Sequence, residues 1–160
     1  MAKVQSLKLP KDRYYAPKEH LWVKIEDGLA RIGLDELGCW AAGTISYVDL
    51  HRPGKRITRL GGAFGTLEAN KFVGALRAPI RGAIVEVNPG VLDDPRLVHQ
   101  DPYGEGWLVR IEPSSLEEDL AALAHGEEAI VRYVTEKIAE YKSRGILPDD
   151  AGPVEVVVVP

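Results

Sequence analysis

A single lysine stands in a mostly apolar stretch of this 160-residue chain. Residues 67–79 read LEANKFVGALRAP, in which Glu68 is the one acidic side chain near Lys71. A lysine amine can be acylated by another enzyme, which removes its charge and lengthens its flexible stem. The plainer alternative is a solvated turn lysine. The stretch therefore poses a choice between an attachment site and an ordinary turn residue.

The neighbouring residues predict that Lys71 lies at or near the tip of a hairpin. Residues 61–68 (GGAFGTLE) are typical of a strand on which something packs closely, since they are rich in small residues. Residues 73–76 (VGAL) predict a second strand after a gap of only a few residues. An amine on such a tip would protrude where a second protein could grip the turn.

Other side chains offer little chemistry. Cys39 is expected to be a small buried residue, and a single cysteine excludes an internal disulfide. Residues 61–65 (GGAFG) resemble a phosphate loop but lack the following Lys-Ser/Thr, so a packing role is favoured. The four histidines show no metal-ligand spacing, and they are His20, His51, His99 and His125. We therefore expect no metal and no catalytic residue, which favours a carrier or binding module over an enzyme.

Composition and charge describe an ordinary globular chain. Hydrophobic residues make up 45% and charged residues 28% of the sequence. The net charge of −4 argues against a nucleic-acid partner. No apolar run approaches the ~20 residues of a membrane span, and the first residues lack the apolar core of a signal peptide. We expect a cytoplasmic protein with no membrane partner.

Short strands separated by Gly/Pro turns dominate the first two thirds of the chain. An irregular lead-in (1–20) precedes a hairpin (21–34), and a helix is expected over 35–42, with Asp35 as N-cap and Gly43 as stop. Strands follow at 44–50, 83–87 and 106–111, with a long loop over 91–106. This pattern predicts a small β-sandwich or barrel.

The pattern becomes helical after Pro113. Ser114 and Ser115 each precede a glutamate by three residues, which indicates a capping box. An amphipathic stripe then predicts a helix over residues 127–142, and its members are Ile130, Val134, Ile138 and Tyr141. The β-prone tail 154–159 is either an added edge strand or a disordered end, and the sequence leaves this open.

Several separate stretches together resemble the glycine cleavage H-protein family. Residues 17–23 (PKEHLWV) are similar to the family's opening Lys-Glu-His-Glu-Trp, and residues 78–88 (APIRGAIVEVN) to its Ala-Pro-Val-Ser-Gly-Glu-Ile-Val-Glu-Val-Asn. Further matches are residues 30–34, 45–50 and 101–108. Residues 68–75 (EANKFVGA) fall where the family carries its modified segment, Glu-Ser-Val-Lys-Ala-Ala-Ser-Asp.

The resemblance implies a fold, a cofactor and a site. The fold is a mainly β, flattened lipoyl/biotinyl-type barrel-sandwich hybrid of two antiparallel sheets, spanning residues 14–125. Residues 126–160 would form a C-terminal helical appendage and the β-prone tail. Lipoic acid would be attached covalently to Lys71 by a lipoate ligase or lipoyl transferase, with Glu68 recognised by that enzyme. The other implied cofactor-binding residues are Phe72, Gly74 and Pro79.

The departures from the family bear on the cargo. Two family carboxylates that would hold an ammonium group are replaced by Leu21 and Ala75, and a common histidine by Ala41. Hydrogen bonds to a charged group are each worth about 1.5–3 kcal/mol, so their loss matters for a cationic cargo. Glu19 and Asp35 are the acidic residues that could substitute for them.

These replacements lead us to expect a carrier of sulfur intermediates. The chain then resembles the H-like lipoate-binding protein of heterodisulfide-reductase-like sulfur oxidation, and that complex would be its partner. The alternative is a glycine cleavage H protein, which carries an aminomethyl group between the decarboxylase and the aminomethyltransferase. A third hypothesis is a non-lipoylated binding or regulatory module, against which the Glu68, Lys71 and Pro79 spacing argues.

Overall fold

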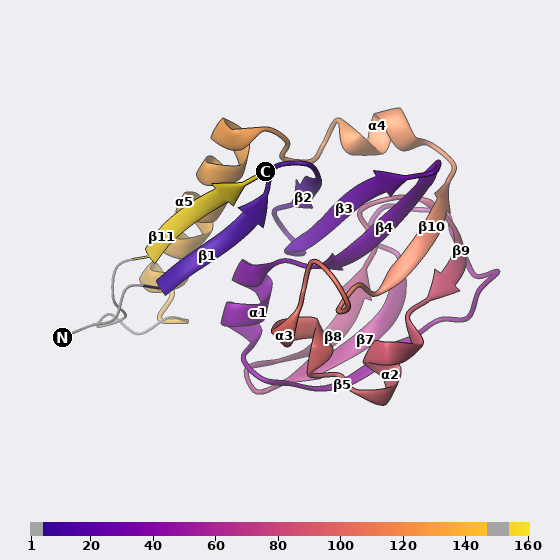
Figure 1. Ribbon diagram of the computed structural model, residues 1–160, viewed down its shortest axis with the longest axis horizontal. Helices are drawn as coiled ribbons and strands as arrows, with labels where there is room; N and C mark the ends of the chain where they lie inside the picture. Colours follow the sequence, from indigo (N-terminus) through magenta and orange to yellow (C-terminus); the bar gives the residue numbers. More distant parts are fainter. Residues whose placement is uncertain (1–4, 147–153) are drawn as a thin grey trace.

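Two antiparallel sheets enclose the main core in the computed structural model, which describes residues 5–146 and 154–160 (Figure 1). Within these residues the larger sheet has the strand order β2-β3-β4-β10-β9-β6, and the smaller has the order β5-β7-β8. The strands of the larger sheet are β2 (Tyr14–Ala16), β3 (Leu21–Glu26), β4 (Leu29–Leu34), β10 (Val109–Pro113), β9 (Gly82–Val87) and β6 (Arg56–Ile57). This arrangement confirms the expected flattened barrel-sandwich.

The smaller sheet consists of β5 (Ile45–Leu50), β7 (Ala63–Ala69) and β8 (Phe72–Arg77). Buried side chains alternate with exposed ones along β7, where Phe64 and Leu67 face the core and Thr66 and Glu68 face solvent. Such alternation is what a sheet with one buried face requires. Gly65 allows the close approach that its small size predicted, because a Cβ there would lie 2.3 Å from the carbonyl oxygen of Asp49.

The first hairpin forms as expected. Strands β3 and β4 pair from Leu21↔Leu34 to Glu26↔Leu29. The two residues between them have positive φ, 52° at Asp27 and 78° at Gly28. This is the primed turn whose twist suits a two-residue hairpin.

Helix α1 (Glu36–Ala42) also forms where predicted. The Asp35 side chain accepts a hydrogen bond from the Gly38 amide at 2.8 Å, and Gly43 ends the helix with φ 81°. The predicted long loop over 91–106, in contrast, contains α2 (Pro89–Asp93) and α3 (Leu97–Gln100). These helices are too short for a periodic apolar stripe, although Asn88 caps α2 by accepting from the Gly90 amide.

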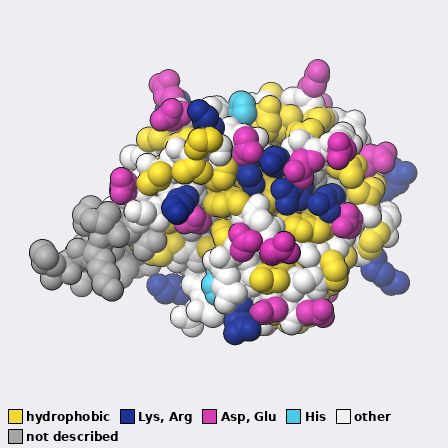
Figure 2. Space-filling view, in the orientation of Figure 1, with side chains coloured by type: hydrophobic (Ala, Val, Ile, Leu, Met, Phe, Trp, Pro, Cys, Tyr) yellow, Lys and Arg dark blue, Asp and Glu magenta, His cyan; other side chains and the backbone are white. Residues whose placement is uncertain are grey.

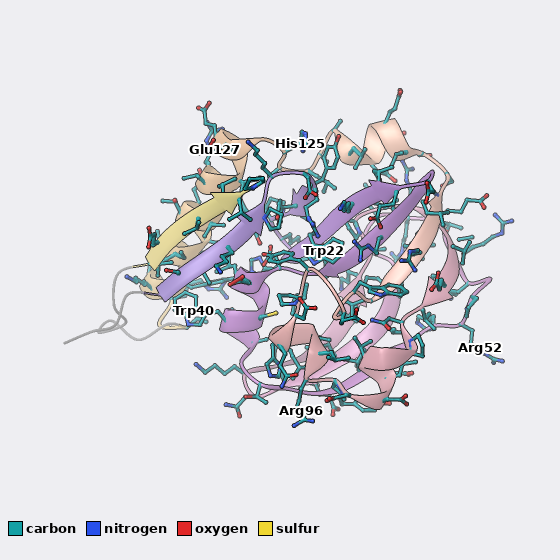
Figure 3. The ribbon with its side chains drawn as sticks, viewed as in Figure 1. Trp22, Trp40, Arg52, Arg96, His125 and Glu127 are labelled. Carbon is teal, nitrogen blue, oxygen red and sulfur yellow. The ribbon has the colours of Figure 1, made fainter. Side chains whose placement is uncertain are left out.

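The predicted irregular lead-in was wrong, because β1 (Gln5–Pro10) and β2 lie within it. Strand β1 pairs in parallel with β11 (Val154–Val159), so the C-terminal tail is an added strand. Strands β1 and β11 lie with α5 (Glu127–Ser143) at one side of the molecule (Figure 1). They form a second core cluster around Trp22, whose side chain points into the interior, whereas Arg52 and Arg96 point outward (Figure 3).

Helix α5 confirms the predicted amphipathic stripe, with Ile130 and Val134 buried. Helix α4 (Leu116–Leu120) begins after Ser115, but no side-chain hydrogen bond caps it, so the capping box was wrong. Acidic and basic side chains are interspersed on the face in Figure 2. In residues 5–146 and 154–160 no helix is both long and apolar enough to cross a membrane. The division between residues 14–125 and 126–160 stays a prediction.

Candidate functional site

Lys71 lies in the two-residue turn between β7 and β8, and its side chain is exposed. Neither Asn70 nor Lys71 has a positive φ, so the turn is not of the primed type. The turn is instead fixed to the end of α1. The Lys71 amide donates to the Ala42 carbonyl at 2.8 Å, and the Asn70 amide donates to the Thr44 carbonyl at 3.0 Å. These two bonds hold the backbone while leaving the lysine side chain free to extend.

Gly43 makes this docking possible. A Cβ at this position would lie 3.0 Å from the Asn70 Cβ, and φ there is 81°. Only glycine adopts that conformation at low cost. The residue that ends α1 therefore also sets how closely the Lys71 turn approaches the helix.

A cleft of about 520 Å³ opens beside Lys71. Its walls come from α1, from β8, from the segment before β3 and from the C-terminal end of α5. Apolar side chains dominate the lining, and Glu19, which is partly exposed, is its one carboxylate. The lining residues are Lys18, Glu19, His20, Leu21, Leu34, Gly38, Ala41, Ala42, Leu67, Lys71, Phe72, Gly74, Ala75, Leu76, Arg77, Tyr141 and Ile146. An apolar cleft with a lysine at its rim suits the hydrocarbon and sulfur atoms of a lipoyl group.

The other predicted site residues divide into three groups. Phe72 and Gly74 line the cleft, and a Cβ on Gly74 would lie 2.9 Å from the Phe72 ring. Glu68 faces solvent on the outer side of the sheet, paired with Tyr47 and Val73 across the strands. Pro79 is buried and does not line the cleft. The structure thus brings Phe72 and Gly74 to Lys71 and leaves Glu68 on the opposite face.

The three residues that depart from the family pattern all line the cleft. Leu21 is 1% exposed, and Ala41 and Ala75 are partly exposed. Of the two carboxylates that could substitute, Glu19 reaches the cleft lining, whereas Asp35 does not. Asp35 is fully buried behind it, at the N-terminus of α1.

A buried chain of hydrogen bonds runs from Asp35 to the cleft wall. The Tyr133 hydroxyl donates to Asp35 Oδ2 at 2.6 Å, and the same hydroxyl is 2.7 Å from His20 Nδ1. His20 Nε2 is hydrogen-bonded in turn to the hydroxyl of Tyr141. Both His20 and Tyr141 line the cleft. The chain therefore links a buried carboxyl group to the cleft through three side chains.

Burial shifts the two titratable ends of this chain in opposite directions. It raises the pKa of the Asp35 carboxyl to about 7, although the donors Tyr133 and Gly38 act against the shift. It lowers the pKa of the His20 imidazole to about 4, and the positive charge of Lys137 acts in the same direction. The imidazole is therefore neutral at physiological pH.

This chain of hydrogen bonds was not predicted from the sequence. His20 was noted as a histidine without metal-ligand spacing and as a member of the family-like stretch 17–23, and Tyr141 as part of an amphipathic stripe. His20 also has φ 59°, a left-handed conformation that is uncommon outside glycine. Gly38 allows His20 to pack against α1, since a Cβ on Gly38 would lie 2.9 Å from the His20 Cβ. This glycine within the predicted helix was the one local signal in the sequence that something packs against α1.

Comparison with known proteins shows the class to which this fold and site belong. Residues 13–137 match the family model described as Glycine cleavage H-protein. The glycine cleavage system H protein 2 of Aquifex aeolicus (strain VF5) is 39% identical over 137 residues, which span 85% of this chain and 81% of that protein. The glycine cleavage system H protein of Bacillus velezensis is 42% identical over 109 residues, 68% of this chain and 84% of that protein.

A solved structure agrees. The crystal structure of a glycine cleavage system H protein from Mycobacterium marinum superposes with a TM-score of 0.68 at 33% identity, covering 78% of this chain and 98% of that one. The chain belongs to the glycine cleavage H-protein family, a family of lipoyl carriers. The resemblance drawn from its motifs is thereby confirmed.

Proposed function

We propose that this protein is a lipoyl carrier with Lys71 as its attachment residue. One observation carries the proposal: an exposed lysine lies on a turn that two backbone hydrogen bonds hold at the rim of an apolar cleft. When bound there, a lipoyl group would supply, at the end of a long flexible arm, a disulfide that can be reversibly reduced to a dithiol. The chain's own role is to present the arm, shelter its end and dock on partner enzymes, rather than to catalyse a reaction.

The two faces of the hairpin would serve two roles, recognition by the attaching enzyme and contact with the lipoyl arm. Glu68, exposed on the outer face between Tyr47 and Val73, would be read by the lipoate ligase or lipoyl transferase. Phe72 and Gly74 form part of the cleft wall on the other side and would contact the arm. Pro79, which is buried, would act by holding β8 in place.

We propose an aminomethyl group as the cargo, passed between glycine cleavage enzymes. The relatives that support this are those named above as glycine cleavage system H proteins. The Glu19 carboxylate in the cleft supports it further, because it can pair with a cationic amine. Among the described residues no ion pair already engages Glu19.

A sulfur cargo, handled by a heterodisulfide-reductase-like complex, is the second candidate. The observation in its favour is that Leu21 and Ala75 bring apolar groups into the cleft. A sulfur cargo needs no carboxylate partner. The family comparisons name no such pathway, so they favour the first candidate.

Two measurements test these proposals. Co-expression with a lipoate ligase should raise the intact mass of the protein by one lipoyl group, and Lys71→Arg should abolish the increase because an arginine cannot be acylated in this way. An unchanged mass in the wild-type protein would refute both carrier proposals. Incubation of the lipoylated protein, with its arm in the oxidised disulfide form, with glycine decarboxylase and glycine should then add an aminomethyl group to one sulfur, release CO₂ and leave the other sulfur as a thiol. Failure to load would leave the sulfur cargo.

A further inference from the structure

The polarity of the hydrogen-bond chain behind the cleft follows from counting protons. A tyrosine hydroxyl has one hydrogen to donate and can accept two. Once Asp35 is ionised it can only accept, so the hydrogen of Tyr133 is used on Asp35 and His20 Nδ1 must carry the proton that joins it to Tyr133. A neutral imidazole protonated at Nδ1 has a bare Nε2. Nε2 therefore accepts from Tyr141, whose only hydrogen is directed away from the cleft.

The consequence lies at the cleft wall. With its hydrogen committed to His20, the Tyr141 hydroxyl offers the cleft lone pairs and no donor. Each donor in the chain is polarised by the next, and the chain ends on a carboxylate in a low-dielectric interior. The hydroxyl oxygen of Tyr141 is thus a stronger acceptor than that of an isolated tyrosine.

We propose that Tyr141 binds the cationic end of the cargo, with a chain through His20 to Asp35 fixing the direction of its hydroxyl hydrogen. This inference rests on the proposed aminomethyl cargo. It explains how a cleft with Leu21 and Ala75 in place of two carboxylates could still bind a cation. The negative charge of Asp35 acts through the hydrogen-bond chain on the hydroxyl oxygen of Tyr141. Tyr141 is then the residue that contacts the cargo, and the other members are positioning residues.

The surrounding structure holds the chain in place. The His20 amide donates to the Ala16 carbonyl at 2.8 Å, and its carbonyl accepts from the Asp35 amide at 2.9 Å. These bonds maintain the unusual φ of 59° at His20. Tyr133 is 4% exposed and His20 8%, so water does not compete for their hydrogen bonds. Such constraint is expected of groups that must keep one orientation.

Three variants of the full chain test the inference at pH 8, where Asp35 is ionised. Tyr141→Phe removes the acceptor. Asp35→Asn keeps an oxygen for the Gly38 amide but turns an NH₂ toward Tyr133, which reverses every hydrogen bond in the chain. Tyr47→Phe removes an exposed hydroxyl from the outer face of β5 and serves as the matched control. Thermal unfolding of each variant establishes that it is folded.

The first measurement is the half-life of the aminomethyl group on the lipoylated protein, followed by intact mass. We expect both Tyr141→Phe and Asp35→Asn to shorten it about tenfold, the effect of one hydrogen bond to a charged group. Tyr47→Phe should match the wild type. If the wild type loads but Tyr141→Phe holds the aminomethyl group for as long as the wild type does, the inference about Tyr141 is overturned while the proposed cargo stands. Failure of the wild type to load at all would overturn the proposed cargo.

The second measurement needs no cargo. Nitrogen-15 NMR of the unlipoylated protein should show the His20 imidazole protonated at Nδ1 in the wild type and at Nε2 in Asp35→Asn. A purely structural role for Asp35 would not move the tautomer. A wild-type imidazole protonated at Nε2 would refute the proposed polarity, whatever the half-lives.

Discussion

Replacing Asp35 by asparagine should change how the stability of the protein depends on pH. The folded protein raises the pKa of Asp35 from 3.8 to about 7, so between these values the folded state holds a proton that the unfolded state has lost. The free energy of unfolding of the wild type therefore falls as pH rises through this window. Asparagine has no proton to lose, so this decrease disappears in the variant.

The magnitude follows from the same pKa values. Each pH unit in the window is worth about 1.4 kcal/mol, so Asp35→Asn should gain about 4 kcal/mol relative to the wild type between pH 4 and pH 7. His20 acts in the opposite sense, because its pKa falls from 6.5 to about 4 on folding and the unfolded state then binds the extra proton. The opposite pH dependences that Asp35 and His20 give to the free energy of unfolding nearly cancel in the wild type. In Asp35→Asn only the His20 contribution remains, so the variant should become more stable as pH rises.

Urea unfolding followed by circular dichroism at several pH values measures this difference. Asp49→Asn, which removes an exposed carboxylate from β5, is the control and should track the wild type at every pH. Parallel curves for Asp35→Asn and wild type would show that the buried carboxyl is not protonated in the folded state. The reasoning from burial to pKa would then be wrong.

Three further predictions concern positioning and packing. Gly43→Ala forces a side chain into φ 81° against Asn70, so it should cost about 1–3 kcal/mol in urea unfolding and slow lipoylation of Lys71; unchanged lipoylation kinetics would contradict the docking role. Removing residues 154–160 deletes β11 and uncovers Leu7 and Leu9, so the free energy of unfolding should fall by about 3 kcal/mol. An unaltered urea midpoint would argue against the β1–β11 pair. Cys39 is buried and its thiol pKa is raised by burial, so iodoacetamide should modify it only in denaturant, as mass spectrometry will show.

The parts of the fold that the sequence alone predicted are those that depend on patterns of neighbouring residues. The β3–β4 hairpin follows from period-two alternation around Asp27-Gly28, and α1 follows from its cap and its glycine stop. The tip position of Lys71 follows from two strands separated by two residues. Each of these features depends on neighbours within a few residues, which is why it can be read without the tertiary structure.

Other parts depend on contacts between distant segments. Strand β1 forms because Gln5 lies beside Val154, and no pattern in this six-residue strand indicates a partner so far along the sequence. The capping box failed for a related reason. The buried carboxylate of Asp119 bonds to Arg81, with Oδ1 2.8 Å from Nη2, and this tertiary contact rather than a serine cap anchors α4.

The site divides in the same way. The sequence by itself determined the family and the loss of the two expected carboxylates, and it singled out Lys71 as the proposed attachment residue, because these are matters of residue identity and spacing. Only the tertiary structure decided that Tyr141, from the helix placed outside the carrier domain, lines the cleft with His20. Residues 20, 35, 133 and 141 meet because α5 packs across α1 and the start of β3, and hydrogen bonds between such distant residues leave no periodic trace in the sequence.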